Sequence, residues 1–435
     1  MTSRRTLDLL RHYESRNVTF MERDGSWPIV WERAKGVHVW DAEGKKYLDL
    51  TAAFGVASAG HANTHVVRAG QRQMARLLHA MGDVHPHALK AELARELSRV
   101  TFERWHRAKL KEGCVRAKTI FCNSGFEAVE AALKTAMLAT GRQGIISFEG
   151  GYHGLGYGAL NATHRAHFRA PFRRQLAEFG CFVPFPEDNS HLERTAEAIR
   201  RHRKRQSVGA ILVEPMQARG GIRIPPKHFL KLLRKICDET GALLILDEIY
   251  TGFGRTGEWF ACEHSGIVPD LICLGKALTG GFPLSACVGR AVVMDAAWPE
   301  SNGEAIHTST FLGHPVGCAM ALAQIGEIRR LNLPERSQQL GALLLADLKT
   351  LNAPNLKLNA RGAGLMAGVE LRQPDGSPAT TQALSIIKSL LHRDFILLPE
   401  GEHSNVISFT PPLTITAPQL QQAVRALGEE LRRRT

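Results

Sequence analysis

Two short apolar runs, each followed by a charged residue, constrain the fold of this chain more than any other feature. Residues 242–246 and 271–274 are too short and too continuously apolar for amphipathic helices, which predicts buried strands of a parallel sheet. Asp247 follows the first run directly, and Lys276 stands two residues after the second. Because open α/β sheets bind ligands at the carboxyl ends of their strands, we expect both charges to face one crevice.

A lysine in such a crevice has a distinct chemistry. Loss of hydration lowers the pKa of its amine, which can then act as a nucleophile and form a Schiff base with an aldehyde cofactor. In pyridoxal-phosphate enzymes, a carboxylate beside the pyridine nitrogen keeps that nitrogen protonated, so that the ring can accept electrons. Lys276 and Asp247 fit these two roles. The alternative interpretation is a surface lysine and an aspartate that caps a turn.

The residues around the two charges favour the first interpretation. Residues 244–249 read LILDEI, residues 252–257 read GFGRTG, and residues 274–283 read LGKALTGGFP. These motifs and their spacing resemble the signature of class III pyridoxal-phosphate-dependent aminotransferases, which are enzymes of fold type I. The resemblance runs from about residue 36 to residue 416 and is strongest over residues 117–315.

A competing motif overlaps the same stretch. Gly252, Gly254 and Gly257 spell GxGxxG, the fingerprint of dinucleotide-binding folds. That fingerprint turns directly from strand into helix, and an acidic residue ends a second strand about 20 positions later. Here residues 247–250 intervene, and Asp270 begins the next strand instead of ending it. We therefore do not expect a nicotinamide cofactor.

Further apolar runs at residues 117–122, 144–148 and 208–213 also predict strands. Polar motifs follow all five predicted strands: Ser124, Tyr152, Gln217, Asp247 and Lys276. The resemblance implies an α/β fold, in which helices flank a mostly parallel, seven-stranded sheet in a large domain. It also implies a smaller α+β domain built from both ends of the chain. We assign residues 61–318 to the large domain, and residues 1–60 and 319–435 to the small one.

The turn after residue 122 is a candidate phosphate site. Ser124 and Gly125 open a predicted helix that runs to about residue 140, and free backbone N–H groups at a helix start suit a phosphate. An ordinary N-cap by Asn123 or Ser124 is the alternative. The resemblance places the cofactor phosphate here, usually with Ser, Thr or Ala at the position of Phe126. Backbone donors survive that replacement, whereas a hydroxyl contact does not.

The resemblance also implies the remaining cofactor contacts. It gives Tyr152 the stacking position on the cofactor ring, with His153 as its neighbour. Glu214 is expected to order the site, and Gln217 to approach the phenolic oxygen of the cofactor. Thr310, in the HTSTFLGHP segment, is expected to reach the phosphate in a neighbouring subunit. This implies a homodimer with shared active sites.

The substrate pocket departs from the family pattern. Ser408 stands where the ornithine and 4-aminobutyrate branches place an arginine that grips the substrate carboxylate, and Arg219 stands where they often place an acid. In one interpretation, Arg219 replaces the missing arginine and binds the substrate carboxylate. In the other, the pocket has no fixed cation for a carboxylate at position 408. Phe54 is a candidate pocket wall, and a core aromatic is the alternative. The sequence therefore leaves three classes of amino donor possible: ω-amino acids, simple amines and diamines.

Composition argues against several other classes of protein. Residues 1–17 lack the apolar core of a signal peptide, and no apolar run approaches membrane-spanning length, which predicts a cytoplasmic protein without membrane association. The eight cysteines show no zinc spacing, which predicts free thiols and no structural metal. The net charge is +13, but the basic groups are separated and lack interleaved aromatics, so nucleic acid is not an expected partner.

These observations predict a pyridoxal-phosphate-dependent aminotransferase with a ping-pong mechanism. It moves an amino group from an amine or amino acid donor to an oxo acid, with Lys276 as general base and acid. An aminomutase or racemase of the same fold is the nearest alternative, since it uses the same lysine and aspartate. A catalytically idle relative that binds an anionic polymer is a more distant one.

Overall fold

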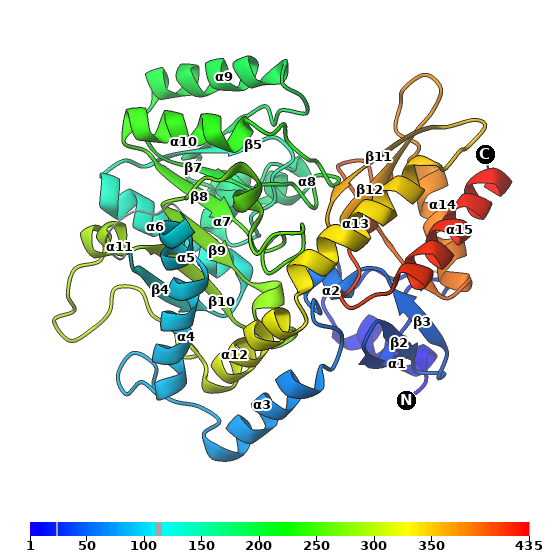
Figure 1. The fold of residues 1–435 in the computed structure, drawn as a ribbon, viewed down its shortest axis with the longest axis horizontal. Helices are drawn as coiled ribbons and strands as arrows, with labels where there is room; N and C mark the ends of the chain where they lie inside the picture. The colour runs from blue at the N-terminus through cyan, green and yellow to red at the C-terminus, as the bar shows by residue number, and fades with distance from the viewer. Residues whose placement is uncertain (23–24, 109–114, 435) are drawn as a thin grey trace.

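The centre of the molecule is a seven-stranded sheet. The computed structural model describes residues 1–22, 25–108 and 115–434. The strand order is β4-β10-β9-β8-β7-β5-β6, and every neighbouring pair is parallel except the two that β10 makes (Figure 1). The strands are β4 (Ala117–Cys122), β5 (Gly144–Phe148), β6 (Gly180–Val183), β7 (Val208–Val213), β8 (Leu243–Asp247), β9 (Leu271–Leu274) and β10 (Ser285–Arg290). The predicted mostly parallel sheet is confirmed.

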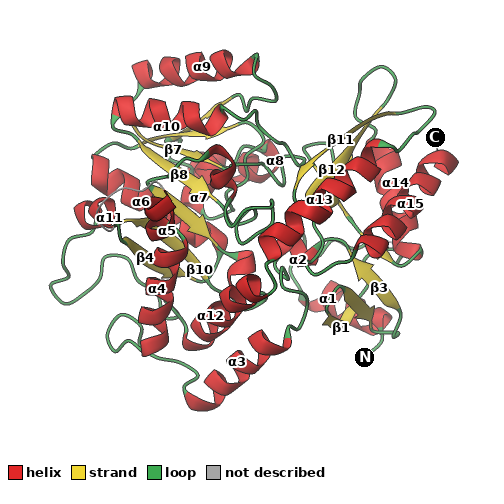
Figure 2. Ribbon diagram, viewed as in Figure 1, coloured by secondary structure: helices red, strands yellow, loops and turns green. Residues whose placement is uncertain are grey.

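Apolar side chains cover both faces of this sheet. Along β8, Leu244 and Leu246 belong to one core cluster, whereas Ile245 belongs to another on the opposite face. This alternation follows from the two-residue period of a strand, and it explains why such runs read as continuously apolar when both faces are covered. Figure 2 shows the strands enclosed between helices. Alanines of α6 (Gly125–Thr140) pack on one face, and Phe229 of α10 (Phe229–Thr240) on the other.

The remaining α-helices lie around this sheet and in the rest of the chain. They are α1 (Ser3–Tyr13), α2 (Ala52–Gly55), α3 (Thr64–Arg76), α4 (Ala88–Val100), α5 (Phe102–Ala108), α7 (Tyr157–Ala162), α8 (Ala166–Arg169), α9 (His191–Arg205), α11 (Ala291–Ala297), α12 (Pro315–Arg330), α13 (Leu333–Lys349), α14 (Thr380–His392) and α15 (Ala417–Arg434). Three short 3-10 helices span Ala170–Gln175, Ala261–Ser265 and Lys276–Leu278.

Two four-stranded sheets join the ends of the chain. One contains β1 (Trp31–Lys35), β2 (His38–Asp41), β3 (Lys46–Asp49) and β13 (Phe395–Ile396), and the other contains β11 (Lys357–Ala363), β12 (Met366–Arg372), β14 (Leu398–Glu400) and β15 (Val406–Phe409). Because β13 pairs in parallel with β3, N-terminal and C-terminal segments share a sheet. Both termini lie on the same side of the molecule, at the right of Figure 1. The division at residues 60 and 318 stays a prediction.

The GFGRTG segment links the central sheet to the C-terminal region. The Arg255 side chain is fully buried and donates to the carbonyl of Leu365 at 2.9 Å and to that of Pro411 at 2.5 Å. The segment continues as turns, with no α-helix before the short 3-10 helix at Ala261–Ser265. Asp270 is buried just before β9 and pairs with Arg234 at 2.8 Å and with Arg290. The segment therefore lacks the strand-to-helix turn of a dinucleotide fingerprint.

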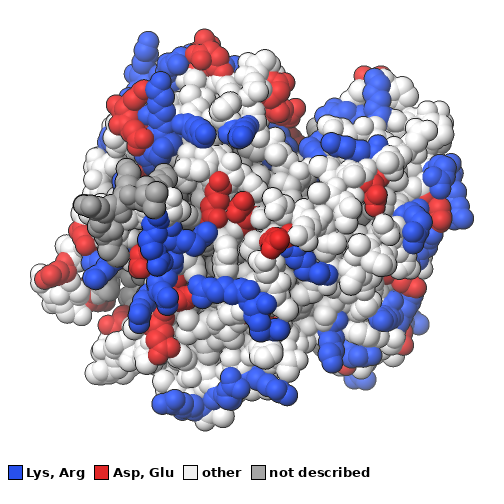
Figure 3. Space-filling model, in the orientation of Figure 1, with Lys and Arg blue, Asp and Glu red and all other residues white. Residues whose placement is uncertain are grey.

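Charged side chains are spread over the surface. On the face shown in Figure 3, Lys and Arg lie in several separate groups with Asp and Glu among them. The densest basic run, residues 200–205, forms the end of α9, where its Lys and Arg residues are exposed. Within residues 1–22, 25–108 and 115–434, no helix is long and apolar enough to cross a membrane, and no three His, Cys, Asp or Glu side chains gather as metal ligands. Seven cysteines are free thiols there, and Cys114 lies outside the described residues.

Candidate active site

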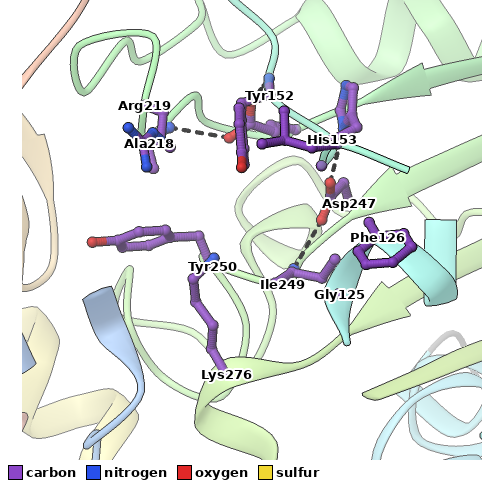
Figure 4. Close-up of a pocket in the computed structure, with 13 residues that line it drawn as sticks. Gly125, Phe126, Tyr152, His153, Ala218, Arg219, Asp247, Ile249, Tyr250 and Lys276 are labelled. Atoms are coloured by element: carbon purple, nitrogen blue, oxygen red, sulfur yellow. Dashed lines mark hydrogen bonds and ion pairs between the residues drawn. The ribbon is translucent and has the colours of Figure 1, made fainter. Parts of the chain in front are cut away.

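A cavity of about 480 Å³ opens at the carboxyl ends of the parallel strands. Its walls come from the segments that follow β4, β5, β7, β8 and β9 (Figure 4). The lining residues are Gly125, Phe126, Tyr152, His153, Gly154, Leu155, Glu214, Ala218, Arg219, Asp247, Ile249, Tyr250 and Lys276. The sheet edge thus brings together most of the residues that the sequence predicts for one site, as expected for an open α/β sheet.

Lys276 stands at the start of the 3-10 helix that follows β9. Its φ of 42° lies in the left-handed region, an uncommon conformation for a residue with a side chain. The amine lies 4.6 Å from the ring centre of Tyr250. Burial lowers the pKa of Lys276 below its ordinary value, although the charges of Asp247 and Glu214 oppose this shift. The amine is therefore a better nucleophile than that of a solvated lysine.

Asp247 ends β8 and is held by partners on both carboxylate oxygens. His153 Nδ1 lies 2.8 Å from Oδ2, and the backbone N–H of Ile249 donates to Oδ1 at 3.1 Å. Only 4% of Asp247 is exposed. His153 is fixed in turn, because its backbone N–H donates to the Thr163 hydroxyl at 2.9 Å. The carboxylate therefore keeps one orientation at the cavity wall.

Glu214 joins the loops that form the far side of the cavity. Its carboxylate accepts the backbone N–H of Tyr152 at 2.9 Å and that of Ala218 at 3.1 Å. Burial raises the pKa of Glu214 to about 7; the nearby Asp247 adds to the rise, whereas His153 and the two N–H donors oppose it. One buried side chain thus sets the positions of Tyr152 and of the segment that carries Arg219.

Tyr152 faces Lys276 across the cavity (Figure 4). It follows β5 in a loop where Gly150 and Gly154 have φ of 82° and 106°, a region that glycine adopts readily. The Arg219 guanidinium lies 5.0 Å from the centre of the Tyr152 ring. The Tyr152 ring lines the cavity, where a planar ligand can stack on it.

The N-terminus of α6 forms part of the cavity wall. The backbone N–H groups of Asn123 and Ser124 donate to Glu127 at 2.7 and 3.3 Å. Ser124 caps this end in a capping box with Glu127, and no described residue accepts a hydrogen bond from its buried hydroxyl. The first N–H groups of a helix lack partners within the helix, so this end can accept an anion.

Phe126 closes the wall beside this helix end. A Cβ atom built on Gly154 would lie 2.3 Å from Phe126 Cβ, and one on Gly156 would lie 2.5 Å from its ring. The aromatic ring is therefore packed against a glycine loop. No side-chain hydroxyl is offered at this position.

Five of the predicted site residues do not line this cavity, and one of them, Ser124, directly precedes the lining residue Gly125. Gln217 is buried, and its amide donates to the Glu149 carbonyl at 2.8 Å and accepts from Arg223 at 3.1 Å. Ser408 donates to the carbonyl of Leu398 at 3.0 Å within its own sheet. The others are Thr310, which is exposed in the segment between α11 and α12, and Phe54, which is 50% exposed.

A second cavity of about 320 Å³ adjoins the first through a shared residue, Arg219. Phe54 and Glu400 line this second cavity. Sequence reasoning missed Glu400 and also Tyr250, which lies beside Lys276. Tyr250 follows the DEI motif directly, so its closeness to Asp247 was a usable signal. Glu400 comes from β14, far along the chain, and only the fold brings it here.

The first cavity fits a planar, aromatic, phosphorylated aldehyde. A lysine amine of lowered pKa suits the aldehyde, and a fixed carboxylate suits a ring nitrogen that carries a proton. Tyr152 suits the flat ring, and the α6 N-terminus, where Gly125 lines the cavity and the neighbouring Ser124 hydroxyl still has a proton to donate, suits the phosphate. This set of groups matches pyridoxal phosphate, and it defines the molecule as a pyridoxal-phosphate enzyme of fold type I.

Comparison with known proteins identifies the family. The sequence profile of the family described as "Aminotransferase class-III" matches residues 20–431. Acetylornithine aminotransferase of Methanosarcina mazei is 37% identical over 409 residues, 94% of this chain and 93% of that protein. Putrescine aminotransferase of Pectobacterium atrosepticum is 36% identical over 417 residues, 94% of this chain and 84% of that protein.

Solved structures agree with this result. The crystal structure of a pyridoxal-phosphate-bound amine transaminase from an uncultivated Pseudomonas species superposes with a TM-score of 0.86 at 27% identity, and it covers 97% of this chain and 99% of that one. The chain belongs to the class III aminotransferase family, whose members use pyridoxal phosphate. The predicted family, enzyme class and cofactor are confirmed.

Proposed function

We propose that this aminotransferase carries out its reaction in the first cavity, with Lys276 as the residue that binds the cofactor covalently. The observation that carries the proposal is the meeting of a buried lysine and a fixed carboxylate, Asp247, at one sheet edge. Once bound, pyridoxal phosphate supplies an electron-accepting ring that stabilises negative charge on the substrate carbon. The residues of the chain bind and orient the cofactor and the substrate, and they transfer the proton.

Each of the remaining site residues receives a role in this proposal. Asp247 holds a proton on the ring nitrogen, and His153 keeps the Asp247 carboxylate in place. Tyr152 stacks on the ring, while Glu214 braces its loop. Ser124, Gly125 and the backbone at Phe126 bind the phosphate at the α6 N-terminus.

Lys276 also moves the proton. Lys276 would hold the cofactor aldehyde, and its Nζ atom, once released, would take a proton from the substrate carbon and return it as general base and acid. A lowered pKa suits both directions of transfer near neutral pH. A ping-pong cycle follows, in which the donor leaves as a carbonyl product before the oxo acid binds.

A second copy of the chain completes the site in this proposal. Exposed apolar side chains gather in two segments: Met74, Leu77, Leu78, Met81 and Val84 in the first, and Ile306 and Phe311 in the second. The segments adjoin, since Thr308 donates to Asp83 at 2.5 Å and the rings of His79 and Phe311 are 5.3 Å apart. Such a patch is typical of a protein interface, and Thr310 lies inside it. A homodimer in which Thr310 reaches the partner's phosphate site fits this arrangement.

The substrates proposed are amines or amino acids as donors and an oxo acid as acceptor. The related proteins are named for acetylornithine and putrescine, which differ in whether they carry a carboxylate. Arg219 supports carboxylate binding, because it lines both cavities and its Nε is buried without a partner among the described residues. Ser408 is engaged within its sheet, which favours the interpretation that the cation has moved to position 219. Cytoplasmic location stays a prediction from the sequence.

A half-reaction experiment tests this proposal. Purified holoenzyme is mixed with a panel of donors and no acceptor, and the visible absorbance of the cofactor is followed. A transaminase converts its cofactor to the amine form and stops, whereas an aminomutase or racemase returns to the starting form. A protein without cofactor absorbance, or with absorbance that Lys276→Ala leaves unchanged, would instead support an idle relative.

A further inference from the structure

The second cavity contains a buried carboxylate without a partner. Glu400 ends β14, is 6% exposed and lines this cavity. Within residues 1–22, 25–108 and 115–434, its side chain makes no hydrogen bond or ion pair. Two other charged lining residues, Glu22 and Lys388, pair with each other at 2.5 Å. Glu400 is therefore a buried charge that the fold leaves available.

Arg219 shares the cavity with Glu400 but does not neutralise it. The backbone N–H of Gly401 donates to the Arg219 carbonyl at 3.1 Å, so the two segments are tied together. The two side chains nevertheless form no ion pair, and Arg219 instead lies against the ring of Tyr152. A carboxylate and a guanidinium thus stand free in one space, each able to bind a ligand of opposite charge.

The poor hydration of the Glu400 carboxylate favours a cation as its ligand. Burial raises the pKa of Glu400 to about 7; the repulsion of Glu214 adds to the rise, whereas Arg219, Lys276 and Arg165 oppose it. A carboxylate with so little hydration gains more from an ammonium partner than a solvated one does.

The walls of the second cavity suit a hydrocarbon chain. Apolar side chains make up most of its lining: Phe20, Trp27, Phe54, Leu384, Ile387, Leu398 and Pro399. Arg219 lines both cavities, so a ligand that extends from Lys276 past Arg219 would enter the cavity that Glu400 lines. A chain of methylene groups would bury apolar surface along the way and place a charge at its far end.

We propose that Glu400 binds the distal ammonium of the amino donor, so that the donor is an α,ω-diamine. This inference rests on the proposed aminotransferase function and names the donor class for the same site. One amine reacts at Lys276, the methylene chain lies along the apolar wall, and the second amine pairs with Glu400. Arg219 then remains for the carboxylate of the oxo acid, which binds in the other half-reaction. The two charges thereby serve the two substrates of one cavity system.

Three donors of equal chain length test the proposal: 1,5-diaminopentane, 1-aminopentane and 5-aminopentanoate. The rate of cofactor bleaching is measured in single turnover for the holoenzyme and for Glu400→Gln. We expect the wild type to prefer the diamine over the monoamine by at least about tenfold, as a charge-assisted hydrogen bond provides. In Glu400→Gln the kcat/KM for the diamine falls about 10- to 100-fold, and that for the monoamine is unchanged or rises.

Control variants separate recognition from folding. Glu402→Gln removes an exposed carboxylate two residues away and should leave all three rates unchanged. Glu400→Asp withdraws the carboxylate by one methylene group, so that it should keep the preference for a diamine and shift it towards 1,6-diaminohexane. This variant also tests the proposal if Glu400→Gln does not fold, since a purely structural role for Glu400 predicts no change in the preferred length.

The outcomes distinguish the two proposals. Bleaching by the monoamine or the amino acid, with no preference for the diamine, would overturn the assignment of Glu400 and leave the aminotransferase proposal intact. An equal fall for all donors in Glu400→Gln would do the same, because it indicates a structural role. If no donor of any class bleaches the wild-type cofactor, both proposals fail.

Discussion

The two cavities differ in how their charges are held. In the first, Asp247 and Glu214 each accept two hydrogen bonds, so the charged groups have fixed directions. In the second, Arg219 and Glu400 have no ion-pair partner within the described residues. Fixed groups suit chemistry that is the same in every turnover, and free charges suit recognition of two different substrates. Substitutions in the two cavities should therefore have effects of different kind and size.

Replacement of the cavity lysine should have the largest effect. Lys276→Ala removes both the covalent link to the cofactor and the group that moves the proton, so kcat/KM should fall by at least about 10⁴-fold. Lys349→Ala, at the exposed end of α13, is the matched control and should retain wild-type rates. Steady-state kinetics with any accepted donor measure the effect. A Lys276→Ala enzyme with more than a few per cent of wild-type activity would contradict the assignment.

Neutralising the fixed carboxylate should come next. Asp247→Asn keeps the size of the side chain but cannot hold a proton on the ring nitrogen, so kcat should fall about 10²- to 10³-fold. Cofactor absorbance should persist, because Lys276 remains. The surface variant Asp295→Asn serves as control, since Lys118, which is exposed, is the ion-pair partner of Asp295 in the part of the chain that the structure describes. A rise in KM with an unchanged kcat would instead indicate that Asp247 acts in substrate binding. It would contradict the proposed difference between the two cavities.

The pH dependence of the free energy of unfolding should differ between variants of the two buried glutamates, Glu400 and Glu214. The folded-state pKa of Glu400 is about 7, above its ordinary 4.5, so the folded protein retains a proton that the unfolded chain releases. Its contribution to the free energy of unfolding is therefore present below about pH 4.5 and is lost as the pH rises to about 7, by up to about 3 kcal/mol.

Glu400→Gln removes this dependence, so its melting temperature relative to wild type should rise from pH 5 to pH 8. Glu214→Gln should gain less, because the amide cannot accept both N–H groups that the carboxylate holds. Thermal unfolding of the holoprotein at each pH gives the comparison. A larger gain for Glu214→Gln would show that the first cavity is the less well satisfied of the two.

The smallest effect concerns the phosphate end of the first cavity. Phe126→Ser offers a hydroxyl at the N-terminus of α6, and the dissociation constant for pyridoxal phosphate should fall by up to about tenfold. Phe126→Ala opens the same space without a donor, so it should not tighten binding. Titration of the cofactor-free protein measures both constants. Equal constants for the two variants would show that no phosphate oxygen lies near this position.

The central strands could be predicted from the sequence because sheets covered on both faces leave continuous apolar runs. Residues 117–122, 144–148, 208–213 and 271–274 are strands as predicted, and the run at 242–246 is shifted by one residue. Two strands of the same sheet were missed. In β10 (Ser285–Arg290) the apolar run is only three residues long, 286–288, between Ser285 and Gly289, and β6 (Gly180–Val183) has only four residues.

The two cavities were not equally predictable either. The residues of the first follow consecutive strands, so that a local motif and a strand end are enough to place each one. Glu400 reaches the second cavity from a sheet made by residues after 350, and no local pattern connects it with Arg219. For Gln217 the motif predicts the position of the residue but not the direction of its side chain. The EPMQ motif places it at the sheet edge, whereas its side-chain amide donates to the Glu149 carbonyl. Side-chain direction depended on contacts that the motif does not encode.

The covalent link at position 276 can be measured directly. Reduction of the holoenzyme with borohydride fixes the bond between the cofactor and its lysine, and peptide mapping by mass spectrometry then locates it. We predict a single pyridoxyl adduct on Lys276, absent from Lys276→Ala. An adduct on another lysine, or none in a protein that retains its cofactor absorbance, would contradict the account.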